Sequence, residues 1–303
     1  MKKLFGVNVP VTCPMLNDHE VDYESLAKLC VFLIGKGVNG IYANGSTGEM
    51  AFLTVEERKK VLETVVKAAA GRVNVYSMVG TNHVSDTVGL ARHAERAGAD
   101  GIGVVTPYYF RLDDTELENY FLAVSKSVSP DFPVYLYGIP QLALNDISVR
   151  LAERIAGKAG NVVGIKYSYP DMAKIIGFMG INGGSFSVLA GADDLFLAAL
   201  ASGGDGTISG NSNVIPEHFT AIYHAAKKGD FAAARKIQAK TNKLISVISG
   251  PNNIARYKAA LVHRGVIAGD AMREPLRSLA GDERAVFIDT IEKMNYTDPS
   301  LDL

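Results

Sequence analysis

The stretch Asn161-Val162-Val163-Gly164-Ile165-Lys166 is an apolar run that ends in one lysine, the pattern of a buried strand that surfaces at its carboxyl end. A similar run, Pro133-Val134-Tyr135-Leu136-Tyr137, comes earlier and ends in a tyrosine. Continuous apolar strands of this kind are typical of parallel sheets that are covered on both faces. Because parallel neighbours end at the same edge of a sheet, we expect Lys166 and Tyr137 to share one cavity.

Strand-like runs recur along the chain, with amphipathic segments of helical periodicity between them, such as 23–35, 55–70 and 84–97. Thr54 and Glu57 form the pattern of a capping box at the start of one of these helices. Eight alternations predict a (β/α)8 TIM barrel, and no glycine-rich dinucleotide fingerprint follows the first strand to favour a doubly wound sheet. The predicted strands begin near Val7, Gly40, Val73, Gly101, Val134, Val162, Phe186 and Gly206.

The chain continues for about ninety residues past the eighth predicted strand, more than a barrel requires. Helical patterns cover 217–228, 231–248, 253–265 and 282–293, and no stretch has the composition of a flexible linker. We therefore predict one domain over 1–303, made of a barrel (1–220) and a C-terminal helical extension (221–303). The extension either caps one side of the barrel or forms a subunit contact.

Composition excludes several classes of protein. The 303 residues are 48% hydrophobic and 21% charged with a net charge of -1, which argues against a nucleic-acid or anionic-membrane partner. Cys13 and Cys30 are too few for a disulfide framework, and no window reaches the length of a membrane span. The N-terminal stretch faintly mimics a signal peptide, but Pro10 and Pro14 interrupt it. We expect a cytoplasmic protein.

The carboxyl ends of the predicted strands are where a barrel of this kind places its site. Hydroxyl side chains dominate there, with one lysine and no His/Cys/carboxylate cluster of metal-binding type, so we expect no metal and no cofactor. The ends comprise Pro14, 44–49, 79–80, 107–110, Tyr137, Lys166, Ser168, Asp193, Asp194, Ile208 and Ser209.

Lys166 and Tyr137 suit amine catalysis on a carbonyl compound. Apolar surroundings remove hydration from a lysine and favour its neutral amine, which attacks a ketone to form an iminium. Tyr137 is then placed to move a proton between the substrate hydroxyl and the reacting centre. The alternatives are a solvated lysine at a strand end and a core tyrosine with a satisfied hydroxyl.

The segment Asn44-Gly45-Ser46-Thr47-Gly48-Glu49 is a glycine-flanked turn after the second predicted strand. Its glycines allow a ligand to approach the backbone, and the hydroxyls and amides of Ser46 and Thr47 can bind a carboxylate. The alternative is a simple strand-to-helix loop. The turn is not a phosphate-binding P-loop, because no lysine followed by Ser or Thr comes after the glycines.

Together these motifs resemble the dihydrodipicolinate synthase/N-acetylneuraminate lyase family of class I, Schiff-base-forming aldolases. They fall in the family's order and at similar spacings over roughly the first 220 residues, and the helical tail is also similar. The matching motifs are GSTGE at 45–49, TPYY at 106–109, YLYGIP at 135–140, GIK at 164–166, GADD at 191–194 and GTIS at 206–209.

The resemblance implies roles for five positions. Lys166 matches the Schiff-base lysine, and Tyr137 matches the catalytic tyrosine. Ser46 and Thr47 match the pair that holds the pyruvate carboxylate. Ile208 matches a residue whose backbone carbonyl lines the pyruvate pocket. The partner implied is therefore pyruvate or another small 2-oxo acid.

The resemblance also implies an oligomer. Tyr109 matches a tyrosine that reaches into the neighbouring subunit's site in many members. The expected assembly is a homotetramer built as a dimer of dimers.

Departures from the family pattern bear on the second substrate. Leu142 stands where the synthases have an arginine for the substrate carboxylate, as in the sialate-lyase and sugar-acid aldolase branch, and a leucine cannot make that contact. Arg111 is an alternative cation. Gly138 replaces the usual asparagine, and Tyr167 and Tyr169 are bulkier than the family norm, which suggests a loop shaped for an unusual second substrate.

Four polar residues match positions where sialate lyases contact sugar hydroxyls: Ser168, Asp193, Asp194 and Ser209. Such groups suit a polyol by hydrogen bonding, although an acidic pair can also cap the following helix.

We therefore predict a pyruvate-dependent aldolase or lyase acting on a 2-oxo-3-deoxy acid, such as a sugar acid of the N-acetylneuraminate or 2-keto-3-deoxygluconate type. The alternatives are a synthase condensing pyruvate with aspartate semialdehyde, a dehydratase of 2-oxo sugar acids, and a non-catalytic protein that binds a small carboxylate.

Overall fold

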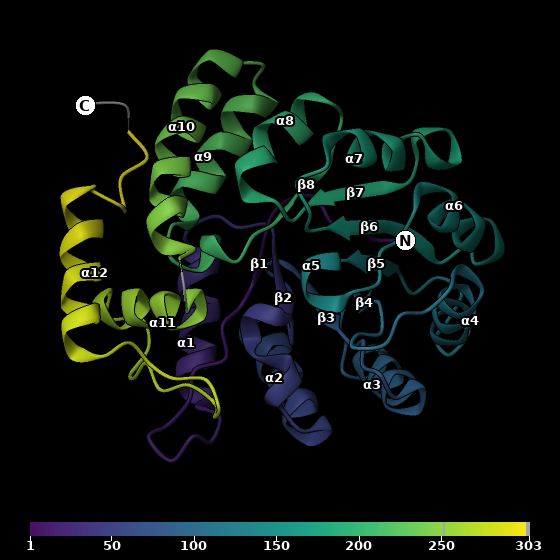
Figure 1. Ribbon diagram of the computed structural model, residues 1–303, viewed down its shortest axis with the longest axis horizontal. Helices are drawn as coiled ribbons and strands as arrows, with labels where there is room; N and C mark the ends of the chain where they lie inside the picture. The colour runs from purple at the N-terminus through teal and green to yellow at the C-terminus, as the bar shows by residue number, and fades with distance from the viewer. Residues whose placement is uncertain (251, 301–303) are drawn as a thin grey trace.

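Eight parallel strands close into a barrel with helices around it (Figure 1), so the prediction of a TIM barrel is confirmed. The computed structural model describes residues 1–250 and 252–300. The first strand begins one residue earlier than predicted, and the third and seventh strands begin one residue later. The strands are β1 (Gly6–Pro10), β2 (Gly40–Ala43), β3 (Asn74–Met78), β4 (Gly101–Val105), β5 (Val134–Gly138), β6 (Val162–Tyr167), β7 (Ser187–Ala190) and β8 (Gly206–Ile208).

The helices between the strands form the outer layer of the barrel. The predicted capping box opens α2: the Glu57 amide donates to Oγ1 of Thr54 at 3.2 Å, and the Thr54 amide donates to the Glu57 carboxylate at 2.8 Å. These helices are α1 (Tyr23–Gly35), α2 (Val55–Ala69), α3 (Val84–Arg96), α4 (Asp114–Ser125), the short α5 (Pro140–Ala143), α6 (Val149–Lys158), α7 (Met172–Met179) and α8 (Phe196–Ala201).

Tyrosine rings opposite glycines fill the barrel interior. Tyr76 and Tyr135 pack edge to face with ring centroids 5.5 Å apart. A side chain on Gly101 would lie 2.4 Å from the Tyr76 ring, and one on Gly164 would lie 2.5 Å from the Tyr135 ring. The glycines of β4 and β6 therefore make room for aromatic rings, and the interior is a packed core below the open end that holds the site.

Four helices follow the barrel: α9 (Pro216–Lys227), α10 (Phe231–Ile248), α11 (Asn253–His263) and α12 (Gly281–Lys293). They gather on one side of the barrel, with α9 packed on α10 and α11 packed on α12 (Figure 1). The helical C-terminal segment is confirmed, while the division at residue 220 stays a prediction. No helix in the described part of the chain is long and apolar enough to span a membrane.

Candidate active site

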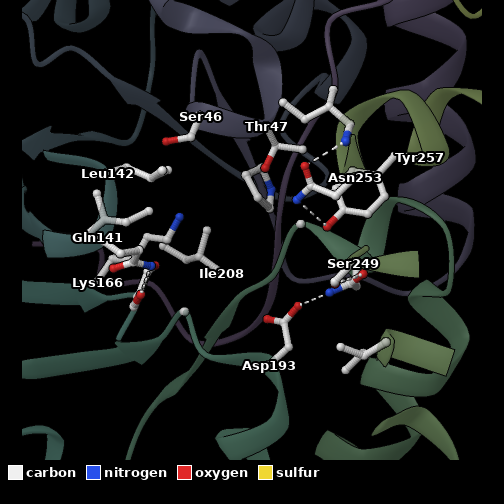
Figure 2. Close-up of a pocket in the computed structure, with 18 of the residues that line it drawn as sticks. Ser46, Thr47, Gln141, Leu142, Lys166, Asp193, Ile208, Ser249, Asn253 and Tyr257 are labelled. Atoms are coloured by element: carbon white, nitrogen blue, oxygen red, sulfur yellow. Dashed lines mark hydrogen bonds between the residues drawn. The ribbon is translucent and has the colours of Figure 1, made fainter. Parts of the chain in front are cut away.

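Lys166 and Tyr137 lie side by side at the carboxyl ends of β6 and β5, where the strand register pairs the two residues directly. The lysine Nζ is 4.1 Å from the centroid of the Tyr137 ring, and both residues are at most 5% exposed. Both line a cavity of about 440 Å³ (Figure 2). An amine and a phenol thus face one space that is large enough for a small organic acid.

Nine of the eleven predicted site residues line this cavity, and they come from the loops and ends of five strands. Tyr109 does not line it: its side chain is 78% exposed. Ser209 also lies outside the lining, because its buried hydroxyl donates to the Asp193 carboxylate at 2.7 Å. The lining residues are Ser46, Thr47, Tyr137, Leu142, Lys166, Ser168, Asp193, Asp194 and Ile208.

The turn that carries Ser46 and Thr47 is held from below. The Asn44 side-chain amide donates to the Arg58 carbonyl at 2.9 Å and to Oγ of Ser77 at 3.2 Å. Residues 46–48 form one turn of 3₁₀ helix. A side chain on Gly48 would lie 3.0 Å from the backbone carbonyl oxygen of Val11, which follows β1. The two hydroxyls therefore have fixed positions at the cavity wall.

Tyr42 is a residue of the site that the sequence prediction missed. Its ring lies 5.6 Å from Nζ of Lys166 and is 1% exposed. Its hydroxyl has no hydrogen-bond partner among the described residues, and burial raises its pKa well above the usual value, so the phenol stays neutral. A side chain on Gly103 would lie 1.7 Å from this hydroxyl. The Tyr42 ring thus forms an aromatic surface beside the Lys166 amine.

Asp193 is the acidic group of the cavity. One carboxylate oxygen accepts hydrogen bonds from Ser209 and from the Asn211 amide, each at 2.7 Å. The other oxygen, Oδ1, is buried and has no partner in the described part of the chain. Burial raises the pKa of Asp193, and the hydrogen bonds from Ser209 and Asn211, followed by the charge of Lys166, oppose that shift. An unused acceptor therefore lies at the cavity wall.

The opposite wall is apolar. Leu142 is 68% exposed and, with Ile139, lines both this cavity and an adjoining apolar one of about 290 Å³. Arg111 lines neither, and Lys166 is the one cation among the described lining residues of either cavity. A second carboxylate group on the substrate would therefore meet no arginine at this wall, where Leu142 lies instead.

Ser168 and the C-terminal helices complete the lining. The Ser168 hydroxyl fits beside Gly191, where a side chain would lie 2.0 Å from it, and the Gln141 amide donates to the Ser168 carbonyl at 2.7 Å. The sequence prediction missed five polar members of the lining because they belong neither to the predicted strand ends nor to the motifs of the family resemblance: Gln141, Asn211, Ser249, Asn253 and Tyr257. Among the described residues, no three His, Cys, Asp or Glu side chains are grouped to hold a metal ion.

The model of the dihydrodipicolinate synthetase family matches residues 3–294 of the chain. The chain belongs to this family. Its members are class I lyases and aldolases that bind pyruvate through a Schiff base and act on small substrates, so the protein is a lyase of this kind.

Relatives carry names from both branches of the family. A 4-hydroxy-tetrahydrodipicolinate synthase of Aquifex aeolicus (strain VF5) is 36% identical over 292 residues, 96% of this chain and 98% of that protein. A probable 2-dehydro-3-deoxy-D-pentonate aldolase of Escherichia coli (strain K12) is 34% identical over 82% of both chains. An N-acetylneuraminate lyase of Mediterraneibacter gnavus (strain ATCC 29149) is 34% identical over 87% of this chain and 84% of that one.

A solved structure shows the same fold at full length. The crystal structure of dihydrodipicolinate synthase from Aquifex aeolicus superposes with a TM-score of 0.91 at 35% identity, covering 97% of this chain and 99% of that one. Relatives named for either branch are similarly identical to this chain, at 34% to 36%. The relatives therefore establish the family and its reaction class but do not distinguish the two branches.

Proposed function

We propose that the protein cleaves or forms a 2-oxo-3-deoxy sugar acid through an imine on Lys166, with pyruvate as one product or substrate. The observation that carries this proposal is the direct pairing of Lys166 with Tyr137 at one cavity. Ser46 and Thr47 hold the substrate carboxylate there, and the Ile208 backbone closes the pyruvate end.

The reaction needs only these groups and water. The neutral amine of Lys166 attacks the C2 carbonyl, and Tyr137 protonates the departing hydroxyl, which leaves as water and gives an iminium and a phenolate. The phenolate takes the proton of the C4 hydroxyl, the C3–C4 bond breaks, and its electron pair forms an enamine as the aldehyde leaves. Tyr137 then protonates C3, and water hydrolyses the iminium to pyruvate and the free amine.

The chemistry of the walls favours a hydroxylated second substrate over one with a second carboxylate. Leu142 offers no charge, whereas Asp193 presents an unused acceptor to a donor such as a hydroxyl. A carboxylate beside Asp193 would meet a like charge. The names of the lyase and pentonate aldolase relatives agree with this preference.

The test is intact-protein mass spectrometry after incubation with pyruvate and borohydride. Wild type should gain the mass of one reduced pyruvate imine, and Lys166→Ala should gain none. Retained trapping in Lys166→Ala would refute the role of this lysine. Tyr137→Phe should keep some trapping while turnover falls by about 10²- to 10⁴-fold.

The alternatives give different products in the same assays. A synthase would consume aspartate semialdehyde with pyruvate, and a dehydratase would release water from a 2-oxo sugar acid without releasing pyruvate. A non-catalytic binding protein would be stabilised by pyruvate but would show neither adduct nor turnover.

A further inference from the structure

Helix α11 forms one wall of the cavity, and its position is fixed by a buried ion pair. Asn253, Ile254 and Tyr257 line the cavity, which places them on one face of the helix. The next residue, Lys258, contacts the Glu49 carboxylate at 2.5 Å, and both side chains have no exposed surface. Because Glu49 ends the turn of Ser46 and Thr47, this wall has a fixed distance from the carboxylate-binding hydroxyls.

Tyr257 lines the cavity although the residue is only 3% exposed. A methyl group on Gly210 would lie 3.3 Å from this hydroxyl and 3.1 Å from Oγ1 of Thr47. Gly210 thus leaves a small space beside the two hydroxyls. Figure 2 shows Thr47 and Tyr257 on the same side of the cavity.

The hydrogen bond of the Tyr257 hydroxyl is weak enough to exchange. Asn253 donates to it at 3.5 Å, the limit for such a bond. Burial is the main cause that raises its pKa above the usual value, so the hydroxyl keeps its proton as a donor.

The neighbouring groups form a continuous polar chain at this end of the cavity. Oγ of Ser249 donates to Oδ1 of Asn211 at 3.0 Å, and the Asn211 amide donates to Asp193 at 2.7 Å. Donor and acceptor atoms therefore run from Ser249, at the end of α10, to the Asp193 carboxylate. Leu142 and Ile139 on the other wall supply none.

We infer that Tyr257 is a specificity-determining residue, whose hydroxyl binds a hydroxyl group of the substrate beyond the reacting carbon. The Asn253 amide supports it, and the ligand class is a polyhydroxylated chain instead of a short or apolar aldehyde. This inference rests on the proposed function, because the substrate must be held at Lys166 for its far end to reach α11.

The test compares Tyr257→Phe with Tyr223→Phe, a control on α9 that is 8% exposed and does not line the cavity. Each protein is assayed for addition of pyruvate to aldoses of four to six carbons and to glycolaldehyde. The ratio of kcat/KM for the best aldose to kcat/KM for glycolaldehyde should fall about three- to tenfold in Tyr257→Phe, the effect of one lost hydrogen bond. Tyr223→Phe should keep the wild-type ratio.

A structural role for Tyr257 would lower kcat/KM for both aldehydes together and leave the ratio unchanged, which would overturn the inference. Asn253→Ala provides a second variant if Tyr257→Phe is poorly folded, and the same ratio should fall. A wild type that traps pyruvate but accepts no aldose would also overturn the inference while leaving the imine intact. Absence of pyruvate trapping in wild type would instead refute the proposed function.

Discussion

Gly138 and Tyr167, two departures from the family pattern, occupy complementary space. They are register partners on β5 and β6, and a side chain on Gly138 would lie 2.7 Å from the Tyr167 ring. That ring is 1% exposed and packs against Phe178 with centroids 5.3 Å apart, while its hydroxyl donates to Asp146 at 3.3 Å. Tyr167 therefore belongs to the layer between strands and helices, and the glycine at 138 accommodates it instead of shaping the substrate loop.

This packing predicts that Gly138→Ala destabilises the protein by about 1–3 kcal/mol, because the added methyl overpacks the Tyr167 ring. Gly157→Ala is the matched control: no atom lies within 4 Å of its added methyl, in the helix α6, and it should stabilise by about 0.5–1 kcal/mol. Urea unfolding measures both. An equal loss from Gly138→Ala in a Tyr167→Ala background would contradict the proposed clash.

At the scale of elements, the Glu49–Lys258 pair joins the turn after β2 to α11. Glu49 also accepts from the Arg273 amide at 2.9 Å, and Lys258 donates to the Ala271 carbonyl at 2.8 Å. Glu49 has a positive φ of 58°, which few residues adopt without support. Three segments distant in sequence therefore converge on one pair of charges.

Removing one charge from this pair should cost more than removing a surface charge. Lys258→Met leaves the Glu49 carboxylate buried and unpaired, and we expect a loss of about 3–5 kcal/mol in the free energy of unfolding. Lys28→Met, which breaks the exposed pair with Glu24 on α1, should change it by less than about 1 kcal/mol. Urea denaturation of both variants checks this. Similar losses of unfolding free energy would show that the buried pair contributes no more to stability than the exposed pair.

The strands were predictable from the sequence because each is a short, mostly apolar run between helical patterns, and the α2 boundary because its capping box is local. The same logic located Lys166, which ends its run. It missed Tyr257, because a tyrosine within a helical pattern does not indicate which neighbour it faces. The packing of α11 on the barrel through Lys258 decides that, and no local pattern encodes such a long-range contact.

At the scale of the whole molecule, His218 on α9 joins the helices that follow the barrel to Tyr296, near the end of the described chain. It is fully buried in α9, with Nε2 donating to the Tyr296 carbonyl at 2.9 Å. Burial, and next the positive charge of Lys240, lower its pKa to about 4 from an ordinary 6.5. Between these values the unfolded chain binds a proton that the folded chain does not, so stability falls as the pH drops from 6.5 to 4.

The protonation of His218 therefore lowers the free energy of unfolding by about 3 kcal/mol as the pH falls from 6.5 to 4. His218→Gln should therefore flatten the dependence of the unfolding free energy on pH between 6.5 and 4. His224→Gln, at an exposed position of the same helix, should keep the wild-type slope. The measurement is urea denaturation at half-unit pH steps, and an unchanged slope in His218→Gln would assign the acid sensitivity to other groups.

Tyr109 and Phe110 form an exposed aromatic pair near the cavity loops, and the predicted oligomer gives them a partner surface. They are 78% and 71% exposed, with ring centroids 5.0 Å apart. Tyr109 has a positive φ of 79°, unusual for a bulky residue, and the Asn145 amide holds the segment by donating to the Phe110 carbonyl at 2.7 Å. A rigid loop that presents two aromatic rings to solvent is typical of a surface that another chain covers.

If a second copy covers this pair, as the resemblance to the family implies, Tyr109→Ala/Phe110→Ala should sediment as a smaller species than wild type at the same concentration. Turnover should fall with it, because Tyr109 is then missing from the neighbouring site. Val286→Ala, at a position that is 68% exposed on α12, removes apolar surface elsewhere and should leave sedimentation unchanged. Sedimentation velocity compares all three proteins. A wild-type sedimentation coefficient for the double variant would place the subunit contact on another face and leave Tyr109 without a role in the neighbouring site.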